Sequence, residues 1–129
     1  MSFTNYSEDL VLNWLLTTGS ATRPTAWYVG LFTAAPGETG GGTEVSGNGY
    51  AREAATFTVS GTAPTSATNS SAVEFDPATA SWGTITHVAI FDALTTGNMI
   101  AYAELSASKA IGTNDIFRIP SSNLTITLD

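Results

Sequence analysis

The sequence predicts an all-β protein, an antiparallel β-sandwich or jelly-roll-like barrel, with one short N-terminal helix. Apolar and polar side chains alternate along most of the chain after residue 26, and this period is that of a strand. Stretches rich in glycine, proline and asparagine separate the alternating segments at short intervals, as in sandwiches and barrels. No repeat or shift in composition marks a linker, so we expect residues 1–129 to form a single domain.

The helix is predicted over residues 5–18. Asn5 is the predicted N-cap because Glu8 follows at the capping-box position, and Gly19 is the predicted stop. Four apolar residues recur at helical spacing, namely Leu10, Val11, Trp14 and Leu15. We expect this stripe to pack on the protein's own sheet, and the alternative is that part of it packs on another chain.

The β-sandwich is predicted over residues 26–129, with about seven or eight short strands. These cover residues 26–33, 50–60, 72–75, 81–92, 99–105, 108–111, 116–119 and 122–129. The first has apolar residues on both faces, which predicts a central strand. The fourth and fifth flank a Gly97–Asn98 turn and are expected to form a hairpin.

Several side chains are predicted to lie in the core. In the second strand, Ala55, Phe57 and Val59 are expected to point inward because they alternate with threonines. Trp27 and Trp82 are also expected to be core residues.

Residues 34–49 form the one long predicted loop, with three consecutive glycines near its middle. A loop of ~12–15 residues without structure is uncommon in a compact domain unless it has a function. We therefore expect this loop to contact a partner and to be dispensable for folding, so that deletion of Gly40–Gly49 leaves a folded protein.

Composition excludes several function classes. The net charge is −7 and there are four Lys and Arg residues in all, so binding to nucleic acid or to an anionic membrane is not expected. There is no cysteine, which excludes disulfides, cysteine zinc sites and thiol catalysis. The N-terminus has no basic segment followed by an apolar run, so we expect no signal peptide and synthesis in a cytoplasm.

The residues that support catalysis or metal binding are also sparse. His87 is the one histidine, and it lies mid-strand without an acidic neighbour in sequence to orient it. No serine lies in a Gly-x-Ser-x-Gly elbow, and no lysine follows the glycine run as in a phosphate-binding loop. Glu74 and Asp76 are read as a solvated turn rather than a glycosidase pair. Oxygen ligands for calcium could come from Asn114 with Asp115 or from Glu38 with Glu44, but neither pair has the spacing of an EF-hand. We expect no enzyme activity, no cofactor and no metal.

Charged residues make up only 12 % of the chain, about half the usual share. A surface of Ser, Thr, Asn and Gly is typical of proteins that neighbours cover, which favours an assembly component. Termini and long loops reach neighbours most freely. The candidate partner-binding residues are Ser2, Phe3, Tyr6, Pro36, Glu38, Gly40, Gly41, Gly42, Glu44 and Asn48.

A resemblance supports this class. Residues 27–57 contain Val-Gly-Leu-Phe-Thr, then Ala-Pro, a glycine-rich stretch with Thr-Glu-Val, and Gly-Tyr-Ala-Arg. This arrangement resembles a segment of small tailed-bacteriophage virion proteins, as do residues 80–92, 98–105 and 124–129. The resemblance implies a bacteriophage structural protein located in the virion, with no shared catalytic residues.

The position in the virion is left open between two readings. The chain has no heptads and no collagen-like or β-helix repeat, and it is short for a whole long fibre. The first expectation is therefore a capsid decoration (cement) protein, a homotrimer bound to the major capsid protein at local three-fold positions. The alternative is a tail-fibre, tail-tip or other attachment module that contacts the host surface.

Overall fold

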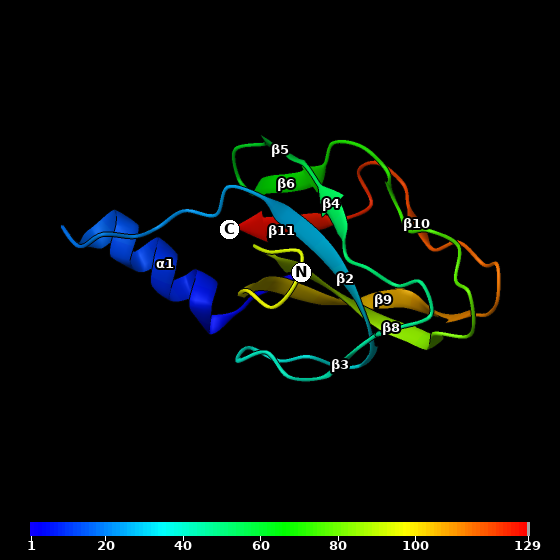
Figure 1. The fold of residues 1–129 in the computed structure, drawn as a ribbon. Coiled ribbons are helices and arrows are strands. Elements are labelled where there is room, and N and C mark those ends of the chain that lie inside the picture. Colours follow the sequence, from blue (N-terminus) through cyan, green and yellow to red (C-terminus); the bar gives the residue numbers. More distant parts are fainter. Residues whose placement is uncertain (129) are drawn as a thin grey trace.

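The computed structural model describes residues 1–128, which form antiparallel strands and one short helix (Figure 1). The helix is α1 (Asn5–Leu16). The strands are β1 (Ser2–Phe3), β2 (Trp27–Ala34), β3 (Thr43–Glu44), β4 (Glu53–Ala55), β5 (Phe57–Ser60), β6 (Thr65–Asn69), β7 (Val73–Glu74), β8 (Gly83–Phe91), β9 (Met99–Ile111), β10 (Arg118–Ile119) and β11 (Thr125–Leu128). The all-β prediction with a short N-terminal helix is confirmed.

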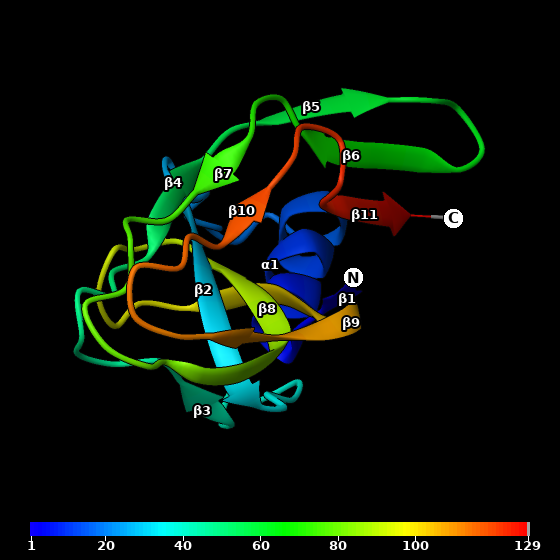
Figure 2. The ribbon, with the colours of Figure 1, turned by 90° about the vertical axis from the view of Figure 1, so that its right-hand side faces the viewer.

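The strands form three antiparallel sheets. The main sheet has the order β1-β9-β8-β2-β3, and β4 also pairs with β2. A three-stranded sheet has the order β11-β6-β5, and β10 pairs with β7. Strands β7, β10 and β11 lie over one face of the main sheet (Figure 2). None of the sheets formed by residues 1–128 closes into a barrel, so the jelly-roll-like barrel alternative is not supported.

β2 is a central strand because both of its faces are buried, as predicted. Val29 and Leu31 are fully buried in the larger core, between the main sheet and the layer of β7 and β10. Phe32 faces the other way, in a smaller cluster with Ala89, Phe91 and Met99. Alternation along one strand therefore supplies side chains to two clusters.

The predicted hairpin is formed by β8 and β9. In the turn between them, the backbone and side-chain N–H groups of Asn98 both donate to the Asp92 carboxylate, at 2.7 and 2.9 Å. β9 continues to Ile111, so the separate strands predicted over 99–105 and 108–111 are one strand with a bulge. His87 pairs with Glu104 and Ile85 with Lys109, so the four residues 105–108 of β9 lie opposite the single residue Thr86 of β8.

The strand predicted over 50–60 is two strands, because the chain passes from one sheet to another at Thr56. β4 pairs with β2, whereas β5 pairs with β6. Val59 is exposed, so the prediction that it points inward is wrong. β6 was not predicted because its threonines and serine resemble a polar turn.

Other predicted boundaries change by a few residues. β7, β10 and β11 are each shorter than the strand predicted at that place, and Asp129 lies outside the described residues. Trp82 is buried as predicted, while Trp27 is only partly buried.

The helix begins at Asn5 as predicted, but it ends two residues earlier than predicted and has a different N-cap. Thr4, not Asn5, is the N-cap, and its hydroxyl donates to the Met99 and Ile100 carbonyls of β9 instead of capping the helix. The Ser7 hydroxyl also donates to the Ile100 carbonyl, at 2.7 Å. The helix ends at Leu16 because Thr17 is extended. α1 is thus held at its first turn and projects from the sheets (Figure 1).

Asn69, at the end of β6, joins the three-stranded sheet to the loops beside it. Its side-chain amide donates to the Ser71 and Pro120 carbonyls, and its side-chain carbonyl accepts from the Leu124 N–H, all at 2.9 Å. The side chain is fully buried, and the Leu124 N–H and the Ser71 carbonyl depend on it for a partner within residues 1–128, whereas the Pro120 carbonyl also accepts from the Asn123 N–H at 3.3 Å.

We expect Asn69→Ala to lower the free energy of unfolding by about 2–3 kcal/mol, because buried backbone groups lose their partners. Urea denaturation followed by circular dichroism measures this change. Asn123→Ala is the matched control because the Asn123 side chain is exposed and forms no hydrogen bond within residues 1–128. Equal effects of the two substitutions would contradict the role given to Asn69.

Candidate interaction surfaces

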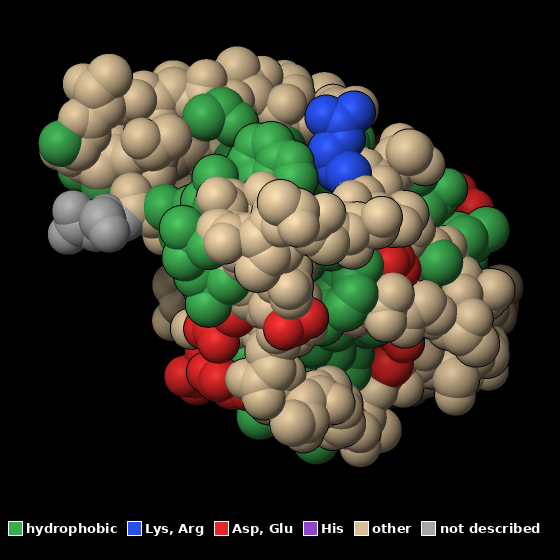
Figure 3. Space-filling model, turned by 90° about the vertical axis from the view of Figure 1, so that its left-hand side faces the viewer, with side chains coloured by type: hydrophobic (Ala, Val, Ile, Leu, Met, Phe, Trp, Pro, Cys, Tyr) green, Lys and Arg blue, Asp and Glu red, His purple; other side chains and the backbone are tan. Residues whose placement is uncertain are grey.

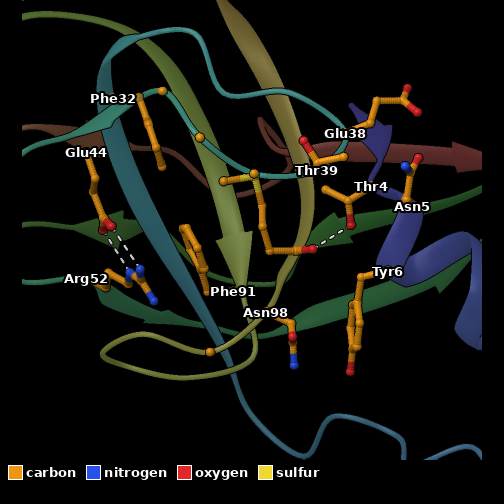
Figure 4. Close-up of a pocket in the computed structure, with 15 residues that line it drawn as sticks. Thr4, Asn5, Tyr6, Phe32, Glu38, Thr39, Glu44, Arg52, Phe91 and Asn98 are labelled. Atoms are coloured by element: carbon orange, nitrogen blue, oxygen red, sulfur yellow. Dashed lines mark hydrogen bonds and ion pairs between the residues drawn. The ribbon is translucent and has the colours of Figure 1, made fainter.

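The N-terminal segment and the glycine-rich loop, far apart in sequence, meet at one groove (Figure 4). The Asn5 backbone N–H donates to the Glu38 carbonyl at 3.0 Å, which joins the start of α1 to the loop. The groove has a volume of about 440 Å³ and is completed by Gly97, Asn98 and Met99 from the β8–β9 turn.

The structure brings together six of the predicted partner-binding residues. Those lining the groove are Tyr6, Glu38, Gly40, Gly41, Gly42 and Glu44. Ser2 and Phe3 pair with β9 beside it, and Pro36 is buried in the loop. Asn48 lies elsewhere, where its side chain donates to the Ser81 carbonyl and its own carbonyl accepts from the Trp82 indole.

An ion pair between Glu44 and Arg52 fixes the inner wall of the groove. The Arg52 Nε and Nη2 atoms each donate to one Glu44 carboxylate oxygen at 2.8 Å. Nη1 donates to the Ala93 and Thr96 carbonyls, and the guanidinium lies 3.4 Å from the centre of the Phe91 ring. All three guanidinium nitrogens therefore have partners within the fold, and Arg52 is a structural residue.

Tyr50 joins this pair to the central strand. Its hydroxyl donates to Glu44 Oε1 at 2.8 Å and accepts from the Leu31 N–H at 2.9 Å. Burial, with the Glu44 carboxylate adding to it, raises the pKa of Tyr50 well above its usual value, so the phenol stays protonated and can donate. A Cβ on Gly30 would lie 2.9 Å from Glu44 Oε1, so glycine is required there.

These contacts explain the sequence motifs as one local structure. Gly30 comes from Val-Gly-Leu-Phe, Glu44 from Thr-Glu-Val, and Tyr50 and Arg52 from Gly-Tyr-Ala-Arg. Val45 is also buried in the larger core. These contacts argue against the expectation that Gly40–Gly49 can be deleted without loss of the fold, because that segment supplies Glu44 and Val45.

The exposed part of the groove carries mainly neutral polar groups. Partial burial, together with the Asp92 carboxylate, raises the pKa of Tyr6, so its hydroxyl is a hydrogen-bond donor. Phe32 and Phe91 stack beneath, with ring centres 6.1 Å apart, and both are buried. Within residues 1–128 no three His, Cys, Asp or Glu side chains are grouped so as to hold a metal ion. The arrangement suits hydrogen bonding to a polar partner.

A second surface lies on α1, where the predicted packing of the apolar stripe on the sheet is wrong. The side chains of Leu12, Leu15 and Leu16 are 56 %, 61 % and 76 % exposed, and they form what we call the leucine face. The opposite side of α1 and the segment that follows it line a hollow of about 440 Å³, the tryptophan groove, formed by Leu10, Val11, Trp14, Ala21 and Arg23.

Hydrophobic side chains gather on the end of the molecule that carries α1 (Figure 3). Trp14 is 70 % exposed even though it lines the tryptophan groove. No helix in the described part of the chain is long and apolar enough to span a membrane. Sequence periodicity identified Leu15 but neither Leu12 nor Leu16 of the leucine face, and it did not indicate the exposure of these side chains, which depends on the direction in which the helix leaves the sheets.

We expect Arg52→Met to lower the free energy of unfolding by about 3 kcal/mol or more, because it leaves the Glu44 carboxylate in the fold without its partner. Arg118→Met is the matched control. The Arg118–Glu74 pair is separated by 3.4 Å and more than half exposed, whereas the Arg52 and Glu44 side chains are 8 % and 25 % exposed. The control should cost about 1 kcal/mol or less in the same denaturation measurement. Similar losses for both variants would contradict a special role for Arg52.

Comparison with known proteins agrees with the resemblance seen in the motifs. The profile of a family described as Podophage GP4 fiber I protein gp80 matches residues 2–127, which include every element from β1 into β11. No curated protein matches the sequence. The chain therefore belongs to the Podophage GP4 fiber I protein gp80 family and is a structural protein of the bacteriophage virion.

Proposed function

We propose that this protein is a subunit of a phage fibre that contacts the host surface. The observation that carries the proposal is the family match, which covers nearly the whole chain and whose description names a fibre protein. Sequence analysis put capsid decoration first and the fibre second. The family description favours the second reading, and no feature of the fold favours the first.

The proposed mode of action is binding without catalysis. Glu44 and Arg52, the ion pair of the groove, bind each other, so neither is placed to transfer a proton. His87 lies outside the groove, and its Nδ1 is 2.8 Å from the Thr86 hydroxyl.

We propose that the protein is made in the host cytoplasm, needs no cofactor, and has other copies of itself and further virion proteins as partners.

The groove rim is the proposed host contact. Glu38 and Thr39 are exposed at the rim, and the Asn5–Glu38 backbone hydrogen bond fixes the loop that carries them. Glu44 and Tyr50 hold the base of the same loop. A contact surface that is rigid before binding loses less conformational entropy on binding than a free loop would.

Labelling of intact virions tests the fibre assignment. Gold-coupled antibody against this chain should mark the tail region in electron micrographs, with copy numbers of about a few dozen or fewer per particle. Labels spread over the head in hundreds of copies would instead establish capsid decoration. Virions that lack the gene for this chain are the control for antibody specificity.

Substitution at the rim tests the host contact. We expect phage carrying Glu38→Lys and Thr39→Arg to adsorb at least about tenfold more slowly, because the change reverses the charge of the rim without removing the Glu38 carbonyl. Adsorption to host cells measures the rate. Glu104→Lys, an exposed reversal on β9, is the matched control. Normal adsorption of fully assembled rim-variant phage would remove the groove from the proposal.

A further inference from the structure

We propose that copies of this chain assemble through α1, with the leucine face of one copy packed into the tryptophan groove of the next. The inference names a partner surface for the proposed fibre subunit and rests on that function for its biological meaning. Its evidence, however, is the exposure and charge of residues 8–23.

The first argument is exposure. Residues 10–16 of α1 contain no charged side chain, and six of these seven residues are apolar. The leucine face and Trp14 are more than half exposed in the single chain. A helix that is apolar on more than one side is typically buried, and contiguous exposed apolar patches mark interaction sites. This helix therefore requires a covering partner.

The second argument is that the two sides of α1 complement each other in charge. Glu8 and Asp9 precede Leu12 by four and three residues, so their carboxylates lie beside the leucine face. Arg23 lines the tryptophan groove on the other side, and it forms no ion pair within residues 1–128. An acidic apolar face therefore fits a basic apolar groove, and a second copy supplies both.

The third argument concerns symmetry. Face and groove are different surfaces, so their contact is heterologous and each copy has one neighbour on each side. A two-fold dimer could join face to groove only if each α1 contacted its single partner on two opposite sides at once, and a two-fold contact between two leucine faces would place Glu8 and Asp9 opposite a second acidic face. A closed ring satisfies both surfaces of every copy, and three copies form the smallest ring with two distinct neighbours. We therefore infer a cyclic trimer.

The base of the helix is suited to this role. The Thr4 and Ser7 hydroxyls donate to the Met99 and Ile100 carbonyls of β9, so the first turn of α1 is fixed to the main sheet. The rest of the helix projects and is accessible to neighbours (Figure 1). Assembly can therefore cover α1 without rearranging the sheets.

The solution mass of the purified chain tests the interface. Light scattering coupled to size exclusion should give three times 13.4 kDa for the unmodified protein. Leu15→Asp with Leu16→Asp should raise the dissociation constant at least about a hundredfold, since it places charges in an apolar contact. The control is Leu94→Asp, at an exposed leucine on the β8–β9 turn. Circular dichroism checks that each variant is folded.

Charge reversal tests which surfaces meet. Arg23→Glu alone, and Glu8→Arg with Asp9→Arg, should each weaken the trimer about tenfold, and the combination of all three should restore it. A failure of the combination to restore assembly would overturn the pairing of face with groove.

The mass of the unmodified protein also tests whether the chain forms a trimer. A monomer or a two-fold dimer at tens of micromolar would overturn the trimer, and so would a trimer that Leu15→Asp with Leu16→Asp leaves intact. These results would not touch the fibre assignment, which depends on virion labelling.

Discussion

The ion pair of Glu44 and Arg52 is the interaction on which the loops of this protein depend. It joins β3, after the glycine run, to the Gly-Tyr-Ala-Arg segment that leads into β4, and Arg52 also donates to carbonyls of the β8–β9 turn. Tyr50 connects the same carboxylate to the central strand β2. A chain with only four basic residues therefore uses one of them for internal order, and a long loop becomes part of the fold.

Much of the fold could be predicted because its signals are local. Alternation along β2 and β8 and the glycine turn before β9 are properties of neighbouring residues, and they predicted a central strand and a hairpin. The threonine-rich strand β6 was missed because its small polar residues resemble a turn, even though it pairs with the neighbouring strand β5. The bend at Thr56 was missed because no glycine or proline marks the change of sheet. The first error concerns composition, since polar residues can form either a strand or a turn, and the second concerns the choice of pairing partner, which a single sequence does not display.

The candidate surfaces could likewise be predicted only where the signal lies in neighbouring residues. The expectation that a terminus and a glycine-rich loop carry contacts identified six of the fifteen residues that line the groove, but nothing local indicated that the two segments touch. Asn48 was included for its place in the loop, and it lies on another side. The apolar stripe of α1 was identified by periodicity, but periodicity is identical for a buried helix and an unpartnered one. A buried helix and an unpartnered one are distinguished only by the path of the chain after Thr17, which periodicity does not indicate.

The bulge of β9 has a consequence for solubility. β1 covers β9 only at Ala101 and Tyr102, so the backbone from Ala103 onward is an open edge of the main sheet in the described part of the chain. Such edges invite uncontrolled cross-β aggregation, and a bulge is one of the ways in which natural sheets interrupt them. The irregular stretch between Glu104 and Lys109 breaks the flat run of backbone groups. The longest strand of the protein is thus less able to template fibrils.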